Sequence, residues 1–170
     1  MICYIIYVVL WNSTKGEKMI LSFCGHSVIA QSINLKERVK EVIRKNVNPD
    51  ESITCYLGAY GEFDTICSIA CKELKKEYTS LELVYVTPYM SISEQNKIKE
   101  LQKSGLCDSS LYPPLENIPP RLSILKRNEW MMSNADLIIA FVSHTSGGAY
   151  KSFLVAKRKN KKIINLGELS

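Results

Sequence analysis

The sequence contains little that would indicate a disulfide framework or a metal centre. Its six cysteines include no CxxC pair, and its two histidines, His26 and His144, have no third ligand at a spacing typical of a zinc site. A free thiol inside an apolar run behaves as a small hydrophobe. Four cysteines lie in such runs: Cys24, Cys55, Cys67 and Cys71. We therefore expect reduced thiols, a cytoplasmic location, and no bound metal or cofactor.

The chain also has little excess positive charge outside one short stretch. Its net charge is +5, and five basic residues stand close together near the end: Lys157, Arg158, Lys159, Lys161 and Lys162. The remainder of the chain is therefore neutral, unlike a broadly basic nucleic-acid binder, and we expect no specific nucleic-acid binding. The cluster is either a solvated helix end, where lysines complement the helix dipole, or a basic patch for an anion.

Long hydrophobic runs are scarce as well. Residues 2–11 are almost wholly apolar, but this run is too short to cross a membrane, and no basic segment precedes it as in a signal peptide. We expect no membrane partner. Residues 1–18 are an extension with two interpretations: an appended strand or loose tail, or upstream translation before a natural start at Met19. Residues 19–170 are long enough for one domain with its own core.

Apolar runs and helical periodicity alternate from Met19 onward. Strands are expected at 20–23, 53–57, 81–87, 137–142 and 162–166. Helix starts are expected at Asn34 (with Glu37 completing a capping box), Asp64, Ser93 and Pro120. This alternation predicts an α/β fold: a three-layer Rossmann-like sandwich with a mostly parallel sheet of about five strands. The proline-rich connection over 105–120 is typical of a rim or lid.

Three glycine loops each follow an apolar run and precede a helical segment, at 23–26, 57–64 and 142–148. Glycine lets backbone N–H groups approach a ligand, and a helix N-terminus adds partial positive charge. Because the carboxyl ends of parallel strands meet at one edge, the loops predict a site for an anionic, nucleotide-like ligand. The expected ligand-binding residues are Gly25, His26, Gly58, Tyr60, Gly61, Asp64, Arg127, His144, Thr145, Ser146, Gly147 and Gly148.

Several of these residues have a purely structural alternative. The segment 145–148 suits a phosphate, but it is also typical of a capped helix start. Asp64 is more typical of an N-cap than of a catalytic acid, and Tyr60 either stacks on a base or is an ordinary loop tyrosine. The histidines could donate to a phosphate or act as a base. Arg127 is either a partner for a phosphate or carboxylate, or a surface arginine.

The order and spacing of these motifs resemble the SLOG superfamily. The matching segments are Phe23-Cys24-Gly25-His26, residues 58–64, residues 127–132 before 134–140, and Ser146-Gly147-Gly148. The superfamily comprises Rossmann-like domains and includes the Lonely Guy phosphoribohydrolases and DNA-processing protein A. The resemblance covers residues 19–166, and it implies a nucleotide or nucleotide-derivative site formed by the glycine loops.

The chain departs from the Lonely Guy motif in its last loop. Those enzymes carry Pro-Gly-Gly-x-Gly-Thr followed by a catalytic glutamate, whereas residues 145–150 here are followed by Lys151 and Ser152. Arg127 roughly matches their catalytic arginine, and without the acid it implies binding rather than hydrolysis. The resemblance therefore favours a homo-oligomeric sensor or sequestering protein that binds a nucleotide-derived signal, such as an NAD-derived or cyclic nucleotide, without turnover.

Two alternatives stay open. An N-glycosidic hydrolase acting on nucleoside phosphates would need Glu129 or Glu62 in place of the missing glutamate, together with Arg127. A nucleic-acid-processing accessory protein would instead use the basic cluster at 157–162.

Overall fold

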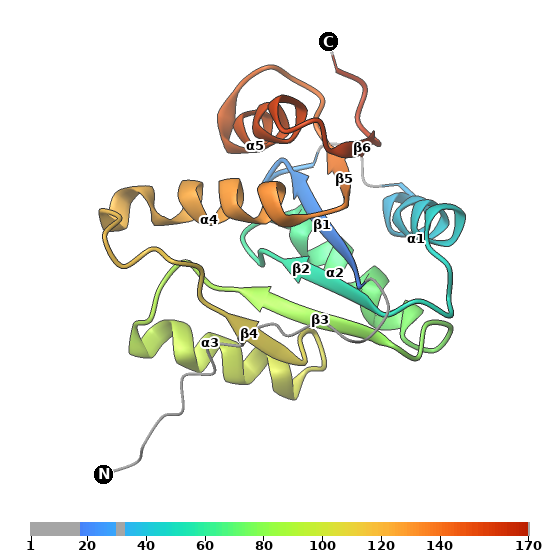
Figure 1. Cartoon of the computed structure of the whole chain (residues 1–170), viewed down its shortest axis with the longest axis horizontal. Coiled ribbons are helices and arrows are strands. Elements are labelled where there is room, and N and C mark those ends of the chain that lie inside the picture. The colour runs from blue at the N-terminus through green and yellow to red at the C-terminus, as the bar shows by residue number, and fades with distance from the viewer. Residues whose placement is uncertain (1–17, 30–32, 170) are drawn as a thin grey trace.

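The fold is built on one parallel sheet. The computed structural model describes residues 18–29 and 33–169, so residues 1–17 of the predicted extension lie outside the described part. The sheet has the order β4-β3-β2-β1-β5-β6, and every neighbouring pair is parallel (Figure 1). Its strands are β1 (Met19–Gly25), β2 (Ile53–Leu57), β3 (Leu81–Val86), β4 (Ser109–Leu111), β5 (Leu137–Phe141) and β6 (Lys162–Asn165). The predicted Rossmann-like α/β class is confirmed.

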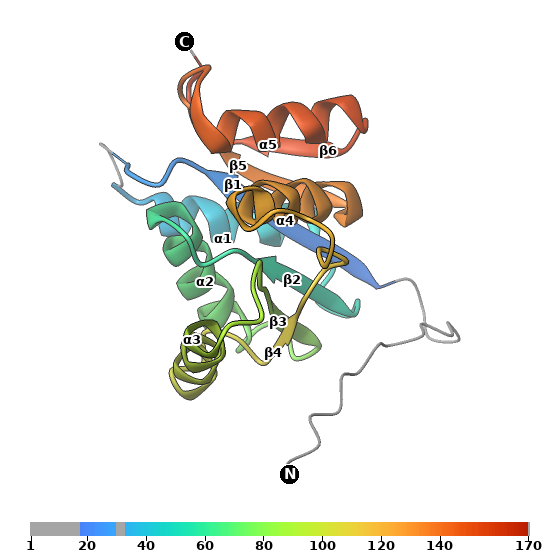
Figure 2. The same ribbon diagram turned by 90° about the vertical axis from the view of Figure 1, so that its left-hand side faces the viewer.

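Helices cover both faces of this sheet. They are α1 (Leu35–Asn46), α2 (Glu62–Leu74), α3 (Ile92–Lys103), α4 (Pro120–Asn134) and α5 (Gly147–Arg158). Helices α1 and α2 lie on one face and α4 and α5 on the other (Figure 2). Each pair of helices covers its own cluster of buried hydrophobic residues. No helix in the described ranges is long and apolar enough to cross a membrane.

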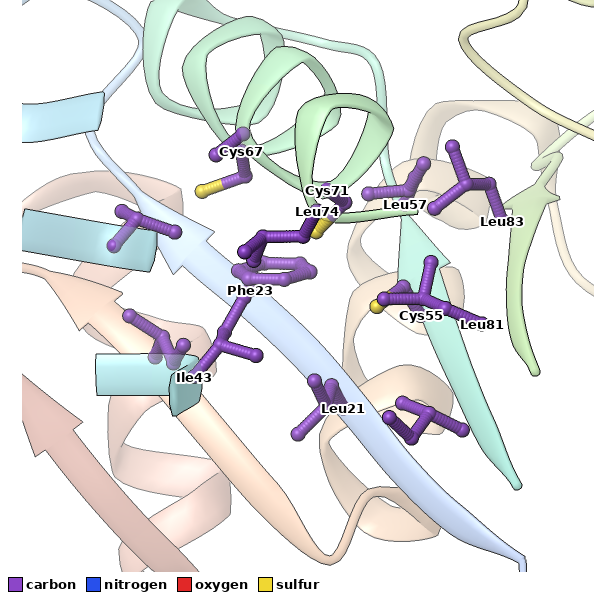
Figure 3. Packing of buried hydrophobic residues seen from close by; sticks show 14 of the residues in the cluster. Leu21, Phe23, Ile43, Cys55, Leu57, Cys67, Cys71, Leu74, Leu81 and Leu83 are labelled. Atoms are coloured by element: carbon purple, nitrogen blue, oxygen red, sulfur yellow. The ribbon is translucent and has the colours of Figure 1, made fainter. Parts of the chain in front are cut away.

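The larger core lies between the sheet and α2. Leu21 and Phe23 on β1 and Leu57 on β2 point toward the helix, which contributes Cys67 and Leu74 (Figure 3). The continuous apolar sequence of the central strands follows from this arrangement, because a parallel sheet is buried on both faces. The cysteines of the described ranges are free and buried, and they pack as small hydrophobes.

The first predicted capping box is not formed. Asn34 does precede α1, but its backbone has a φ of 59°, and its side chain makes no capping hydrogen bond. The left-handed backbone turns the asparagine away from the geometry in which a side-chain oxygen meets the first turn. Glu37 instead pairs with Lys40 at 2.8 Å.

Two other helix starts also differ from the sequence prediction. The N-cap of α3 is Ser91 rather than a residue near Ser93, and its hydroxyl accepts a hydrogen bond from the Glu94 N–H. The N-cap of α2 is Gly61, so Asp64 lies inside the first turn and is not the N-cap. The two N-caps lie two residues before Ser93 and three residues before Asp64.

The proline-rich connection contains one more strand than expected. Within 105–120, Ser109–Leu111 pairs with β3 and forms the edge of the sheet. Three residues are too few for a recognisable alternation of apolar side chains. Pro120 begins α4 as predicted, because proline at the first helical position needs no hydrogen-bond partner for its nitrogen.

Candidate ligand-binding site

The chain order creates a switch point between β1 and β5. From β1 the chain proceeds through β2 and β3 to β4 at one edge, and it then returns to place β5 on the other side of β1. In open α/β sheets, ligands bind at the carboxyl ends of the strands where the order reverses. A pocket of about 360 Å³ lies there. Its lining includes these predicted residues: Gly25, His26, Gly58, Tyr60, Asp64, Arg127, His144, Gly147 and Gly148.

The third glycine loop gives the pocket an open helix start. A Cβ atom placed on Gly147 or Gly148 would meet nothing within 4 Å, and Gly147 has a φ of 82°. The first turn of α5 carries no acidic residue. The N-terminus of α5, which carries the positive end of the helix dipole, therefore borders open space at the pocket. Thr145 and Ser146 flank this loop but are not among the lining residues.

The two histidines meet across the switch point. His26 follows β1 and His144 follows β5, and their rings stack with centroids 3.7 Å apart and planes 12° from parallel. His26 Nε2 accepts a hydrogen bond from the Ser143 N–H at 3.1 Å. Burial, and then the neighbouring His144, lower the pKa of His26. Because Nε2 accepts this hydrogen bond, it carries no proton, and the His26 ring is neutral. The hydrogen bond also fixes the ring at the side of the pocket.

The buried side chain of Arg127 is hydrogen-bonded to the second glycine loop. Its side chain is 1% exposed, and Nη1 donates to the carbonyl oxygens of Gly58 at 2.9 Å and Val86 at 2.7 Å. These carbonyls lie at the carboxyl ends of β2 and β3, so one guanidinium joins two strand ends. Its buried Nε has no hydrogen-bond partner among the described residues. Burial lowers the pKa of Arg127, and the Asp64 carboxylate opposes that shift.

Asp64 brings a carboxyl group into the pocket. Its Oδ2 accepts a hydrogen bond from the Tyr60 N–H at 2.9 Å. Gly58 makes room for it, since a Cβ there would lie 2.6 Å from Oδ2 and 3.3 Å from Arg127 Nη1. Burial raises the pKa of Asp64, and the Tyr60 N–H and Arg127 oppose this effect. The aspartate is therefore a loop-ordering residue with one oxygen committed to the backbone.

Two residues of α3 fix Tyr60 and were missed by sequence reasoning. The Tyr60 hydroxyl donates to Glu94 Oε2 at 3.1 Å, and the buried Glu94 also accepts from the Tyr85 hydroxyl. Lys97 Nζ lies 3.7 Å from the centre of the Tyr60 ring and donates to the Ala59 carbonyl at 3.0 Å. No local sequence signal indicates these contacts, because α3 is about thirty residues beyond the loop in the chain.

The glutamates considered as catalytic residues lie outside the pocket lining. Glu62 Oε2 accepts a hydrogen bond from the Ile29 N–H at 2.7 Å, which ties α2 to the loop after β1. Glu129 pairs with Lys126 at 2.8 Å and borders a second groove between α4 and α5. Gly61 serves packing instead, because a Cβ there would lie 2.9 Å from the Ser27 backbone.

The sheet order and the pocket at its switch point define a Rossmann-like fold. No protein-family model and no curated protein matches the chain. Two similar solved structures are those of DNA processing protein A from Streptococcus pneumoniae and from Helicobacter pylori. Their TM-scores are 0.58 and 0.55, with 16% identity and 86% of this chain covered in both. The chain covers 50% and 64% of those two proteins, less than two thirds of each.

This comparison corrects the expectation about nucleic acid. The Helicobacter pylori protein is described with a single-stranded DNA binding mode, and it shares this chain's fold. Our expectation of no specific nucleic-acid binding rested on the small net charge of the chain, and it is wrong as a conclusion about this fold. The net charge of a chain does not show where its basic side chains lie close together. Lys151, Lys157 and Arg158, for example, line the groove between α4 and α5.

Proposed function

We propose that the protein binds a phosphate-bearing, nucleotide-type small molecule in the switch-point pocket and does not turn it over. The observation that carries this proposal is the open space above Gly147 and Gly148 at the start of α5. Backbone amides at a helix N-terminus are a ready site for a phosphate. The stacked histidines border the same space.

The remaining walls suit the apolar end of such a ligand. Ile124 and Met131 of α4 line the pocket together with the Tyr60 ring. The pocket volume of about 360 Å³ is in the range of small-molecule sites, roughly 300–1,000 Å³. A nucleobase needs an apolar or aromatic wall, and its phosphate needs oriented N–H donors. The apolar residues of α4 and the glycines at the start of α5 border the same pocket.

Binding without turnover follows from where the carboxylates lie. Glycosidic hydrolysis needs a positioned acid or base within hydrogen-bond reach of the reacting atoms. Glu62 and Glu129 are outside the pocket lining, and each has a partner elsewhere. Asp64 is the carboxylate that lines the pocket, where its Oδ2 orders the loop by accepting from the Tyr60 N–H and only Oδ1 can meet a ligand. We infer a binding protein for a signal such as an NAD-derived or cyclic nucleotide, acting as a sensor or by sequestration.

The proposal is tested by ligand titration combined with an assay for released base. AMP, NAD, ADP-ribose and cyclic ADP-ribose are titrated by calorimetry and thermal shift. A ligand at 100 times its Kd stabilises by about 2.7 kcal/mol, which raises the melting temperature by roughly 5–10 °C. We expect such a shift for at least one compound and no base release by chromatography. Base release that is lost in the Asp64→Asn variant would instead establish an enzyme, and no binding by any compound would contradict the proposal.

A second candidate ligand is single-stranded nucleic acid. The observation that favours it is the second groove, about 320 Å³, where Lys151, Lys157 and Arg158 surround the apolar Leu154. Basic side chains at such a groove would contact phosphates, and each contact adds to the salt dependence of binding. Lys157→Glu combined with Arg158→Glu should then weaken oligonucleotide binding and reduce its salt slope by about 1.4. Unchanged binding of the double variant would remove this groove from consideration.

A further inference from the structure

We propose that Asp64 makes the pocket selective for ribose over 2′-deoxyribose, by accepting a hydrogen bond from the sugar 2′-hydroxyl. This inference rests on the proposed nucleotide-binding function and names the class of nucleotide that the site takes. Its starting observation is a carboxylate that lines the pocket with only one of its two oxygens used: Oδ2 accepts from the Tyr60 N–H, and Oδ1 has no hydrogen-bond partner in the described part of the chain.

The charge arrangement decides which end of a nucleotide meets this carboxylate. Asp64 lies in the first turn of α2, which follows β2, whereas Gly147 and Gly148 begin α5, which follows β5. These strands lie on opposite sides of β1, so they are roughly 10 Å apart across the sheet. A phosphate is repelled by the carboxylate and attracted by the N-terminus of α5. The sugar hydroxyls, which are donors common to all nucleotides and lie between the phosphate and the base, are the groups that we assign to Asp64.

Two groups beside Asp64 stabilise the ionised form of its carboxyl group and act against the effect of burial. Burial raises the pKa of its carboxyl, but the Tyr60 N–H and the Arg127 guanidinium both stabilise the charged form. The guanidinium is fixed by the Gly58 and Val86 carbonyls, so it provides a steady positive field beside the loop. An ionised carboxylate only accepts hydrogen bonds, and a hydroxyl is a matching donor.

Selectivity for ribose follows because a deoxyribonucleotide has no 2′-hydroxyl to pair with Oδ1 of Asp64. Without the hydroxyl, Oδ1 would lose water on ligand binding and gain no donor in return, and a partly desolvated, unpaired oxygen is unfavourable. Because Asp64 is half-buried rather than enclosed, we expect a modest preference of at least tenfold. The alternative role for Asp64 is structural: it orders the Tyr60 loop and takes no part in ligand choice.

One variant separates these two roles. In Asp64→Asn the amide oxygen still accepts from the Tyr60 N–H, which keeps the loop, while an uncharged NH2 donor replaces the free acceptor. Any hydrogen bond from this NH2 to the hydroxyl oxygen lacks the strength that the charged carboxylate gives. Glu62→Gln is the matched control, because Glu62 is a neighbouring carboxylate outside the pocket lining. The melting temperature of each variant reports whether the fold is kept.

The experiment compares Kd values for the four nucleoside 5′-monophosphates and their 2′-deoxy counterparts by calorimetry. For the best-bound base we expect the wild type and Glu62→Gln to prefer the ribonucleotide at least tenfold. We expect the preference in Asp64→Asn to fall below about threefold, with little change in deoxyribonucleotide affinity.

Equal ribo and deoxy affinities in the wild type, or a preference that survives in a folded Asp64→Asn variant, would overturn the ribose inference alone. Failure of every nucleotide to bind the wild type would overturn the proposed function as well. If Asp64→Asn does not fold, the ribo-to-deoxy ratio of the wild type still decides the inference.

Discussion

Gly148 offers a perturbation in which protein stability and ligand binding should move in opposite directions. A Cβ at this position would meet nothing within 4 Å, so Gly148→Ala brings no clash in the unliganded protein. The backbone of Gly148 is not among those with positive φ, so alanine adopts it without strain. Gly148 lies in the first turn of α5, where alanine is favoured over glycine by up to about 1 kcal/mol. We therefore expect the melting temperature to rise by roughly 1–4 °C.

Ligand affinity should fall in the same variant, because the added methyl group enters the space assigned to the phosphate. Gly148→Val fills more of that space, and valine is close to glycine in helix propensity, so its stability should stay near that of the wild type. We expect Gly148→Val to weaken nucleotide binding at least about tenfold, or 1.4 kcal/mol. Calorimetry gives the affinities, and thermal denaturation gives the stabilities.

Gly25 provides the contrast for this experiment. A Cβ on Gly25 would lie 2.7 Å from the Phe63 Cβ, so Gly25→Ala should destabilise by about 1–3 kcal/mol through overpacking. Wild-type affinity in Gly148→Val would remove the third glycine loop from the site. A fall of several degrees in the melting temperature of Gly148→Ala would show that the space above the loop is not open.

Three further predictions concern residues around the pocket. Arg127→Met leaves the Gly58 and Val86 carbonyls without their buried donor, so we expect a loss of about 3 kcal/mol and a melting temperature lower by roughly 6–12 °C in thermal denaturation. The pKa of His26 is lower in the folded protein than its unfolded value of about 6.5. The neutral ring therefore contributes its full stabilisation above about pH 6.5, and this contribution is lost as the pH falls through the folded pKa. Thermal scans from pH 7.5 to 5 should show a steeper fall for the wild type than for His26→Gln. Glu129→Gln should leave nucleotide affinity unchanged in calorimetry, because Glu129 lies outside the pocket and pairs with Lys126.

The strands and the loops after them were predictable because each rests on a local pattern. The apolar runs at 53–57 and 137–142 indicate strands buried on both faces, and the glycines after them indicate where backbone must approach another group. The edge strand at 109–111 was not predictable, since three residues carry no periodicity and its pairing with β3 is set by tertiary contacts.

The details of the site depend on helix boundaries that the sequence does not determine. The acidic residues Glu62 and Asp64 are close neighbours, and only the start of α2 decides which of them enters the pocket. With Gly61 as N-cap, Asp64 reaches back to the Tyr60 N–H while Glu62 faces the loop after β1. The contacts of Glu94 and Lys97 with Tyr60 depend on how α3 packs beside the loop, which no local pattern encodes.

If a nucleotide occupies the switch-point pocket, the backbone amides of the glycines that line it should report its binding directly. We would titrate the 15N-labelled protein with AMP and with NAD and follow the backbone amide signals of the glycines. Gly25, Gly58, Gly147 and Gly148 line the pocket, whereas Gly105 follows α3 and serves as the internal reference. The account predicts saturable shifts at the pocket glycines, largest at Gly147 and Gly148, with the Gly105 signal unmoved. Signals of Gly147 and Gly148 that stay in place at saturating ligand would contradict it.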